Sequence, residues 1–270
     1  MDIFPRTLVL LLCLAGSGRA VFTRNQTDRC CPDACCNGIM FGGLTGNAPE
    51  FLPKNCQDIR EIGGGKNGLY TIYPTNIESC DGVRVYCDQS TDGGGWTVIQ
   101  RRMNGWVDFN RGWDEYRDGF GYLTGEFWLG LDIIHHITTQ STSEMVIYME
   151  DWLNTIARVQ YWNFWVGDEA SNYTLSVKNF DIGSDVPDGL RVHHGMKFST
   201  FDRDNDRFLG NCAVDYTGAW WYNACLESNL NGQYLRGNNP AAYGQGVVWT
   251  PWTGYTYSLK TVVMMVRPVQ

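Results

Sequence analysis

Alternation of apolar and polar positions marks the middle of the chain. It is found between residues 144 and 151 and again between residues 157 and 164. A period of two buries one face of a β-strand and leaves the other in water, so both segments are predicted to be strands with one wet face. Shorter apolar runs bounded by Gly, Pro or Asp predict further strands at residues 69–73, 83–86, 96–101, 173–177 and 258–267.

Helices are expected to be few and short. Residues 56–62 fit a short helix that ends at a run of glycines. The spacing in 109–120 and 127–137 is also helix-like, although Gly130 weakens the second segment. After residue 181 the chain turns irregular and rich in Gly, Asn and Asp. The pattern predicts an α+β fold, in which an antiparallel sheet with a few helices carries a long lobe built from loops.

The composition agrees with a loop-rich fold. The 270 residues include 11 Trp, 14 Tyr and 31 Gly, and rigid aromatic side chains set among glycines are not typical of a helical bundle. The net charge is −8 and no basic run is present. Nucleic acid and anionic membrane surfaces attract clustered Lys and Arg, so neither is expected as a partner.

Residues 1–20 have the features of a secretory signal peptide. A basic residue precedes an apolar core at residues 8–15, and small residues follow, with cleavage expected after Ala20 or Gly18. The core is far shorter than the ~20 residues of a membrane-spanning helix, and no later segment reaches that length. We therefore expect a secreted, extracellular protein with no membrane span.

The cysteines and sequons suit an oxidising, secretory compartment. Of the 10 cysteines, Cys13 would be removed with the signal peptide, which leaves an odd number. In a secreted protein these are interpreted as disulfide partners rather than zinc ligands. At least one must stay free or bridge to another chain, so we expect a disulfide-linked homo-oligomer. Two Asn-X-Thr sequons predict glycosylation at Asn25 and Asn172.

Residues 21–55 differ in composition from the rest and are interpreted as a cysteine-rich arm. Four cysteines are crowded into a short stretch, several Gly and Pro follow, and no apolar periodicity indicates a core. One interpretation is interchain crosslinking through these cysteines, and the other is a small self-contained knot. The cysteines concerned are Cys30, Cys31, Cys35 and Cys36.

Three alternating aspartates begin the most distinctive part of the irregular segment. Asp202, Asp204 and Asp206 precede Cys212 and Cys225, whose loop contains a Trp pair and two tyrosines. Carboxylates at alternate positions can converge on one hard cation, with carbonyls completing a shell of about six to eight oxygens. A disulfide across the next loop, if formed, would stabilise by roughly 3 kcal/mol and hold an aromatic wall beside the ion. The other interpretation is an acidic surface turn beside buried tryptophans.

The aspartate run does not fit an EF-hand. Counted from Asp202, that loop needs Gly at its sixth place and Glu at its twelfth, whereas this sequence has Arg207 and Ala213. A different scheme for Ca²⁺ remains, in which the ligands recur at intervals of two residues. The predicted ligands are the side chains of Asp204 and Asp206 and the carbonyls of Phe208 and Gly210.

No catalytic motif accompanies these residues. The sequence has no Gly-x-Ser-x-Gly elbow, no His-Glu-x-x-His pair and no glycine-rich phosphate loop between a strand and a helix. The histidines form two adjacent pairs, 135–136 and 193–194, and neighbours on a strand point to opposite faces. We interpret them as structural or solvated, and we expect a binding protein rather than an enzyme.

Short motifs run in a fixed order through the chain from residue 55. They are NCQDI at 55–59, VYCD at 85–88, TDGGGWTVIQRR at 91–102, GFG at 119–121, GEFWLGLDII at 125–134, FST at 198–200, DND at 204–206, GNCA at 210–213, GAWWY at 218–222, SNLNGQY at 228–234 and YSLK at 257–260. Together they resemble the fibrinogen C-terminal domain family over residues 55–268. Within that family they are most similar to ficolins and tachylectin-type lectins, without the collagen region of ficolins.

The resemblance implies a fold similar to the predicted one, within residues 56–268. It has a small N-terminal subdomain, a central twisted antiparallel sheet, and a loop-rich C-terminal lobe with calcium and ligand sites. The resemblance assigns calcium to the same four ligands. It also implies disulfides between Cys56 and Cys87 and between Cys212 and Cys225. Cys80 is then left to pair with the arm or with another chain.

In the lectin branch, an acetyl group sits in an aromatic pocket beside the second disulfide. The matching positions are Tyr216, Leu226, Tyr243 and Gly244. Ficolin-like lectins usually have His where this chain has Leu226, so the backbone N–H is kept and a side-chain donor is lost. The resemblance implies a calcium-dependent lectin that binds acetylated glycans in innate immune defence. The alternative is a matrix, adhesion or receptor-ligand protein of the same family that binds proteins.

Overall fold

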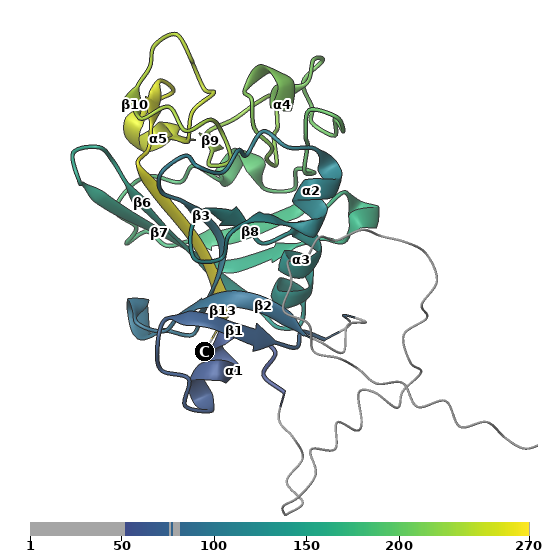
Figure 1. The fold of residues 1–270 in the computed structure, drawn as a ribbon. Helices are drawn as coiled ribbons and strands as arrows, with labels where there is room; N and C mark the ends of the chain where they lie inside the picture. The colour runs from purple at the N-terminus through teal and green to yellow at the C-terminus, as the bar shows by residue number, and fades with distance from the viewer. Residues whose placement is uncertain (1–51, 76, 78–81, 270) are drawn as a thin grey trace, which may run out of the picture. The chain divides into compact units, whose positions relative to one another are not determined.

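The computed structural model describes residues 52–75, 77 and 82–269, and a nine-stranded sheet dominates this part of the chain. The strand order is β1-β2-β3-β13-β6-β7-β8 (Figure 1), and β5 also pairs with β3 and β4 with β5. All pairs are antiparallel. The strands are β1 (Gly68–Ile72), β2 (Val83–Asp88), β3 (Trp96–Arg102), β4 (Phe120–Gly121), β5 (Phe127–Trp128), β6 (Ser143–Glu150), β7 (Ile156–Val166), β8 (Leu175–Phe180) and β13 (Thr261–Pro268).

The predicted α+β architecture is confirmed, and every predicted strand has a counterpart with slightly different ends. The segment expected at 258–267 is divided, because Ser258 ends a short strand and Thr261 begins β13. The helices are indeed short. They are α1 (Cys56–Glu61), α2 (Trp113–Asp118), α3 (Leu131–Thr139), α4 (Cys212–Asp215), α5 (Thr250–Thr253) and the 3₁₀ turns η1 (Thr91–Gly93), η2 (Glu169–Ser171) and η3 (Arg191–His193).

Two helix predictions were too long. The segment 109–120 is helical only in α2 and ends at the start of β4, and the segment 127–137 begins as β5 before α3 starts. Gly130 lies between β5 and α3 with a φ of 105°, a backbone conformation that residues with a Cβ rarely adopt. The chain therefore changes from strand to helix at this glycine. His135 and His136 lie on α3, as the helix predicted at 127–137 implies, so the argument that this pair points to opposite faces of a strand is wrong.

A small N-terminal unit is formed by α1, β1 and β2. The Asn55 side chain caps α1 by accepting hydrogen bonds from the backbone N–H groups of Gln57 and Asp58, at 2.9 and 3.1 Å. A disulfide between Cys56 and Cys87 joins this helix to β2. Because β2 also pairs with β3, the unit is continuous with the main sheet.

The core has an aliphatic and an aromatic part. The aliphatic part lies where α3 packs on β7 and β13, with Ile134 and Ile137 buried. In the aromatic part, the Trp128 ring of β5 stacks on Phe198, at a centroid distance of 6.0 Å, and Trp221 lies 5.2 Å from Phe198. These rings come from the sheet and from the irregular segment, so their packing fixes the two parts against each other.

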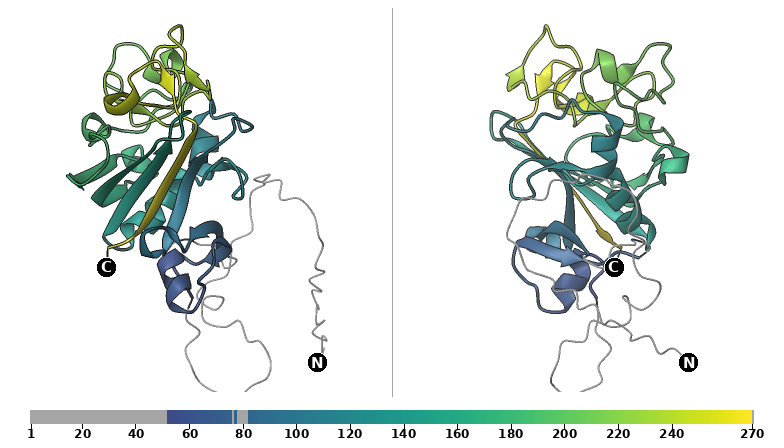
Figure 2. Two further views of the ribbon diagram at one scale, coloured as in Figure 1. Left: turned by 90° about the vertical axis from the view of Figure 1, so that its left-hand side faces the viewer. Right: turned by 45° about the vertical axis from the view of Figure 1, so that its right-hand side comes forward.

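The irregular segment from residue 182 to 260 forms a lobe at the end of the sheet opposite to α1, β1 and β2 (Figures 1 and 2). It contains short two-stranded pairs rather than a sheet of its own, which is the loop-rich arrangement that the sequence predicts. No helix in the described ranges is long and apolar enough to cross a membrane. The short strands of the lobe are β9 (Ser228–Asn229), β10 (Gly237–Asn238), β11 (Val248–Trp249) and β12 (Tyr257–Ser258).

Candidate cation loop and aromatic pocket

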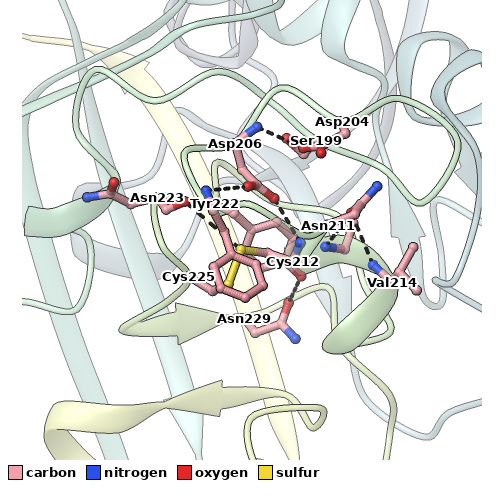
Figure 3. The surroundings of a disulfide bond; sticks show 12 residues. Ser199, Asp204, Asp206, Asn211, Cys212, Val214, Tyr222, Asn223, Cys225 and Asn229 are labelled. Atoms are coloured by element: carbon pink, nitrogen blue, oxygen red, sulfur yellow. Dashed lines mark hydrogen bonds between the residues drawn. A yellow bond between two sulfur atoms is a disulfide. The ribbon is translucent and has the colours of Figure 1, made fainter.

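The Asp206 carboxylate organises the loop in which calcium is predicted. One of its oxygens accepts a hydrogen bond from the backbone N–H of Phe208, at 2.8 Å. The other accepts from the Cys212 N–H at 2.8 Å, and Asp204 accepts from the Asp206 N–H at 3.1 Å (Figure 3). Burial raises the pKa of Asp206, and the negative charge of Asp204 raises it further. A cation held between the two carboxylates would remove that repulsion.

The two predicted carbonyl ligands are available. The carbonyl oxygens of Phe208 and Gly210 accept no hydrogen bond from any described residue, and both residues are exposed. Within the described part of the chain no group of three or more His, Cys, Asp or Glu side chains is arranged to hold a metal. A cation at this loop would therefore be held by two carboxylates, two carbonyls and water, a set that fits a hard oxygen-preferring ion such as Ca²⁺.

The first aspartate of the run has a different role. The Asp202 carboxylate accepts hydrogen bonds from the Trp113 backbone N–H, at 3.0 Å, and from the Thr200 hydroxyl, at 2.6 Å. It therefore caps the start of α2 and links that helix to the lobe. This agrees with the four-ligand scheme, which does not include Asp202.

We call residues 204–210 the cation loop. The disulfide Cys212–Cys225 joins the end of this loop to the segment around Cys225 (Figure 3). The backbone N–H of Arg207 donates to the Asn223 carbonyl, and the N–H of Asn223 donates to the Cys225 carbonyl, both at 2.9 Å. The Cys212 N–H, as described above, bonds to Asp206. The cation loop is thus bonded to residues next to both cysteines of the disulfide.

Three of the four predicted pocket residues lie in direct proximity. The backbone of Gly244, at a φ of 72°, lies against the Tyr216 ring so closely that an added Cβ would be 2.6 Å from its Cδ1 and Cε1 atoms. The same point is 3.8 Å from the Leu226 side chain, which is buried. Tyr243 is 54% exposed beside them, and its ring stacks on Tyr255 at a centroid distance of 4.5 Å.

The residues of this pocket offer apolar surface together with two hydrogen-bond donors, the Tyr216 hydroxyl and the Leu226 backbone N–H. Burial, and then the proximity of Tyr243, raise the pKa of the Tyr216 phenol, so Tyr216 stays neutral at physiological pH. The Leu226 backbone N–H donates to no acceptor among the described residues. A small group with an apolar end and a hydrogen-bond acceptor would match such a surface.

Asn229 positions the pocket, and the sequence analysis did not identify it as a functional residue. Its fully buried side chain donates to the carbonyls of Tyr216 and Gly244, both at 3.1 Å, and accepts from the Tyr222 hydroxyl at 2.8 Å. The two segments that meet at the pocket are therefore fixed to each other by one amide. The only signal in the sequence was its place in the SNLNGQY motif.

His193 fixes the segment after the disulfide. Its Nε2 accepts hydrogen bonds from the backbone N–H groups of Glu227 and Ser228, at 3.1 and 3.2 Å, so Nδ1 carries the proton and donates to the Trp221 carbonyl at 2.8 Å. Burial lowers the pKa of His193 from 6.5 to about 4. The structural interpretation of this histidine is thus correct, and its neutral form is the one that the fold needs.

We expect acidification to destabilise the protein through His193. The pKa is lower in the folded than in the unfolded chain, so the unfolded chain binds the extra proton between pH 6.5 and 4, and stability falls as pH falls through this window. The loss is on the order of 3 kcal/mol. Denaturant unfolding of His193→Gln against pH should show a shallower slope between pH 6.5 and 5 than the wild-type chain. His194→Gln, at the exposed neighbour, should keep the wild-type slope; equal slopes in all three chains would refute this role.

Several sequence predictions fall outside the described residues. These are the signal peptide, most of the arm, Asn25 and the interchain candidates Cys30, Cys31, Cys35, Cys36 and Cys80. The second sequon is described: Asn172 is half-buried and its Oδ1 accepts from Arg203 at 2.7 Å. Its Nδ2, the atom that would carry a glycan, forms no hydrogen bond to another described residue.

A nine-stranded sheet that carries a loop-built lobe, with a disulfide between a carboxylate loop and an aromatic pocket, defines a fibrinogen-like globular domain. Residues 52–269 match the family model described as "Fibrinogen beta and gamma chains, C-terminal globular domain". The chain belongs to this family, as the resemblance of its motifs predicted.

Its relatives include proteins of greater length. Human Fibrinogen C domain-containing protein 1 is 50% identical over 230 residues, which cover 83% of this chain and 49% of the human protein. The Xenopus tropicalis protein of the same name is 44% identical over 262 residues, covering 94% and 54%. The chain thus spans about half the length of these curated relatives.

Solved structures share the fold. The fibrinogen-like globe domain of human ANGPTL2 has a TM-score of 0.77 and 41% identity, covering 80% of this chain and 99% of that one. Lamprey fibrin D-dimer, complexed with the peptide ligand Gly-His-Arg-Pro-amide, has a TM-score of 0.75 and 34% identity, covering 89% and 78%.

Proposed function

We propose that this chain is a secreted, calcium-dependent, lectin-like protein that binds acetylated carbohydrates in innate immune defence. The observation that carries the proposal is the close approach of the Tyr216 ring, the Gly244 backbone and the Leu226 side chain, beside a Leu226 N–H that donates to no described residue. An acetyl group has the two features that such a pocket can recognise, namely a methyl group and a carbonyl oxygen.

The acetyl methyl group would pack between Tyr216 and Leu226, and the carbonyl oxygen would accept from the Leu226 N–H. Tyr243, which is exposed, would contact the sugar ring outside the pocket. Calcium would neutralise the Asp204 and Asp206 carboxylates. Asp206 holds the Cys212 N–H and Asn223 is bonded to the cation loop, so the loop would shape the pocket without contacting the sugar.

A single shallow pocket binds weakly, so several linked pockets would be needed for firm attachment to a surface. We propose that the cysteines of the arm, with Cys80, link copies of the chain into a disulfide-linked homo-oligomer, which raises the effective concentration of pockets. Secretion through the predicted signal peptide would supply the oxidising compartment that such links require.

Retention on an acetylated matrix tests the proposal. We expect the secreted chain to bind beads that carry N-acetylglucosamine in the presence of calcium, and to be released by free N-acetylglucosamine or by a chelator. Beads that carry glucosamine without the acetyl group are the matched control and should retain nothing. Absence of calcium-dependent retention on any acetylated matrix would overturn the lectin function.

The second candidate function is recognition of extracellular proteins. It is favoured by Leu226, which makes the pocket more apolar than that of the ficolin-like lectins, and by the lamprey fibrin relative, whose structure contains a bound peptide. In that case the chain would be retained by matrix or cell-surface proteins, and free N-acetylglucosamine would not release it. The same bead experiment, with the competitor included, therefore separates the two functions.

A further inference from the structure

A second recess lies between the C-terminal end of α3, the start of β6 and the middle of β7, away from the residues of the aromatic pocket. Its volume is about 540 Å³, within the range of about 300–1,000 Å³ that is typical of small-molecule sites. No ionisable side chain lines it. Its wall includes five neutral polar residues and one exposed tryptophan, namely Thr139, Ser141, Thr142, Ser143, Asn163 and Trp165. We call it the α3–β7 groove.

The loop that forms one side of the groove is held in place. Gln140 accepts a hydrogen bond from the Thr75 backbone N–H, at 3.3 Å, and donates to the Lys54 carbonyl, at 3.2 Å. The Ser143 hydroxyl donates to the Ser141 carbonyl at 3.3 Å. These bonds tie the loop between α3 and β6 to the N-terminal unit, so the groove exists without a ligand.

Polar groups in the groove keep their hydrogen-bonding capacity. The half-buried Asn163 amide forms no hydrogen bond with another described residue, and neither does the hydroxyl of Ser141 or Thr142, both of which are exposed. An amide offers two donors and an acceptor, and a hydroxyl offers one donor and an acceptor. The groove therefore presents several neutral donors and acceptors to a ligand.

Trp165 supplies a flat apolar surface next to these groups. Its side chain is 41% exposed, whereas its neighbours on β7, Phe164 and Val166, are buried. Strand alternation thus directs Trp165 away from the core, where it pairs in register with Ser176 of β8. Exposed indole faces at such positions commonly mark binding surfaces.

We infer that the α3–β7 groove binds a neutral saccharide. The C–H face of one sugar ring lies on the Trp165 indole, and the sugar hydroxyls bond to Asn163, Ser141 and Thr142. A phosphate, sulfate or carboxylate ligand would need a cationic partner, which the lining lacks. A protein partner would need a wider apolar patch than one exposed tryptophan provides.

The test uses the secreted full-length chain and three oligosaccharides without acetyl groups: cellotetraose, laminaritetraose and maltotetraose. Each is titrated while the indole N–H signals of the chain are followed by NMR, with the Trp165 signal identified by its loss in Trp165→Phe. We expect a saturable shift of that signal with at least one oligosaccharide, with a Kd on the order of 1 mM for a single open groove. Because Trp165→Ala lacks this signal, the Kd values of the wild-type chain and of the variants are compared by saturation-transfer NMR of the oligosaccharide, and Trp165→Ala should weaken binding by on the order of tenfold.

Trp162→Ala is the matched control, because Trp162 lies on the same strand and is 45% exposed but does not line the groove. It should change the Kd by no more than about twofold. Asn163→Ala, which leaves the strand's aromatic residues intact, should weaken binding as well. Tyr216→Ala should leave it unchanged, so failure of the acetyl pocket and failure of the groove are distinguishable.

Three results would overturn the inference. They are the absence of saturable binding by all three oligosaccharides, an equal loss of affinity in Trp165→Ala and Trp162→Ala, and an unchanged Kd in both Trp165→Ala and Asn163→Ala.

Discussion

Replacement of both Asp204 and Asp206 by alanine is expected to abolish the stabilisation of this chain by calcium. At a free calcium concentration of 100 times Kd, binding to the folded state stabilises by about 2.7 kcal/mol, which corresponds to about 5–10 °C in Tm for a domain of this size. The double variant should show no calcium-dependent shift in a thermal melt, and calorimetric titration should detect no calcium binding at the loop.

A carboxylate outside the loop provides the control. Asp215 is an exposed aspartate in the same lobe, and its carboxylate accepts no hydrogen bond from the described residues. Asp215→Asn should therefore retain the full calcium-dependent shift, since it removes one negative charge without removing a predicted ligand. Unchanged calcium affinity in the double variant would disprove the assignment of Asp204 and Asp206 as ligands. Loss of the shift in Asp215→Asn would mean that net charge, rather than coordination, controls the effect.

Replacement of Gly244 by alanine is expected to eliminate retention on acetylated beads. The new Cβ would lie 2.6 Å from two carbons of the Tyr216 ring, so the ring must move out of the pocket wall. Such overpacking costs about 1–3 kcal/mol, in addition to about 1–2 kcal/mol for alanine at a φ of 72°. Bead retention and thermal unfolding of the secreted variant measure the two effects.

Gly254→Ala separates the steric effect from the backbone effect. Gly254 has a φ of 79°, close to that of Gly244, but an added Cβ would meet no atom within 4 Å. We expect this variant to lose stability through the backbone alone and to keep its retention on the beads. If Gly244→Ala retains binding, or if both variants lose it equally, the acetyl pocket does not lie between Tyr216 and Gly244.

The sheet could be predicted from the sequence because a half-buried strand imposes its period of two on consecutive residues. The error at α3 has a local cause, since the glycine at position 130 allows a turn between a strand and a helix that share one apolar run. For the lobe, the sequence predicted only that it is built from loops. Its conformation depends on buried side chains that bond to distant backbone groups, as Asn229 and His193 do, and such contacts leave no periodic pattern.

The candidate site also has one part that local sequence predicts and another that it does not. The spacing of Asp204 and Asp206 predicted a carboxylate loop from residues that are close in sequence, and the structure arranges their side chains around one turn. The pocket needed the family resemblance, because Tyr216 and Gly244 are far apart in the chain and meet only in the folded lobe. The α3–β7 groove gave no signal in the sequence, since serines, threonines and an asparagine carry no motif.

The position of β13 sets an order for the folding of the chain. Among the described residues, this strand follows all other strands in the sequence, yet it lies between β3 and β6 and is the only link between the two halves of the main sheet. Until residues 261–268 have emerged from the ribosome, β3 and β6 each have an unpaired edge, which is a template for aggregation. Truncation of the chain before residue 261 would therefore leave two separate sheet fragments, each with an unpaired edge, rather than a smaller domain.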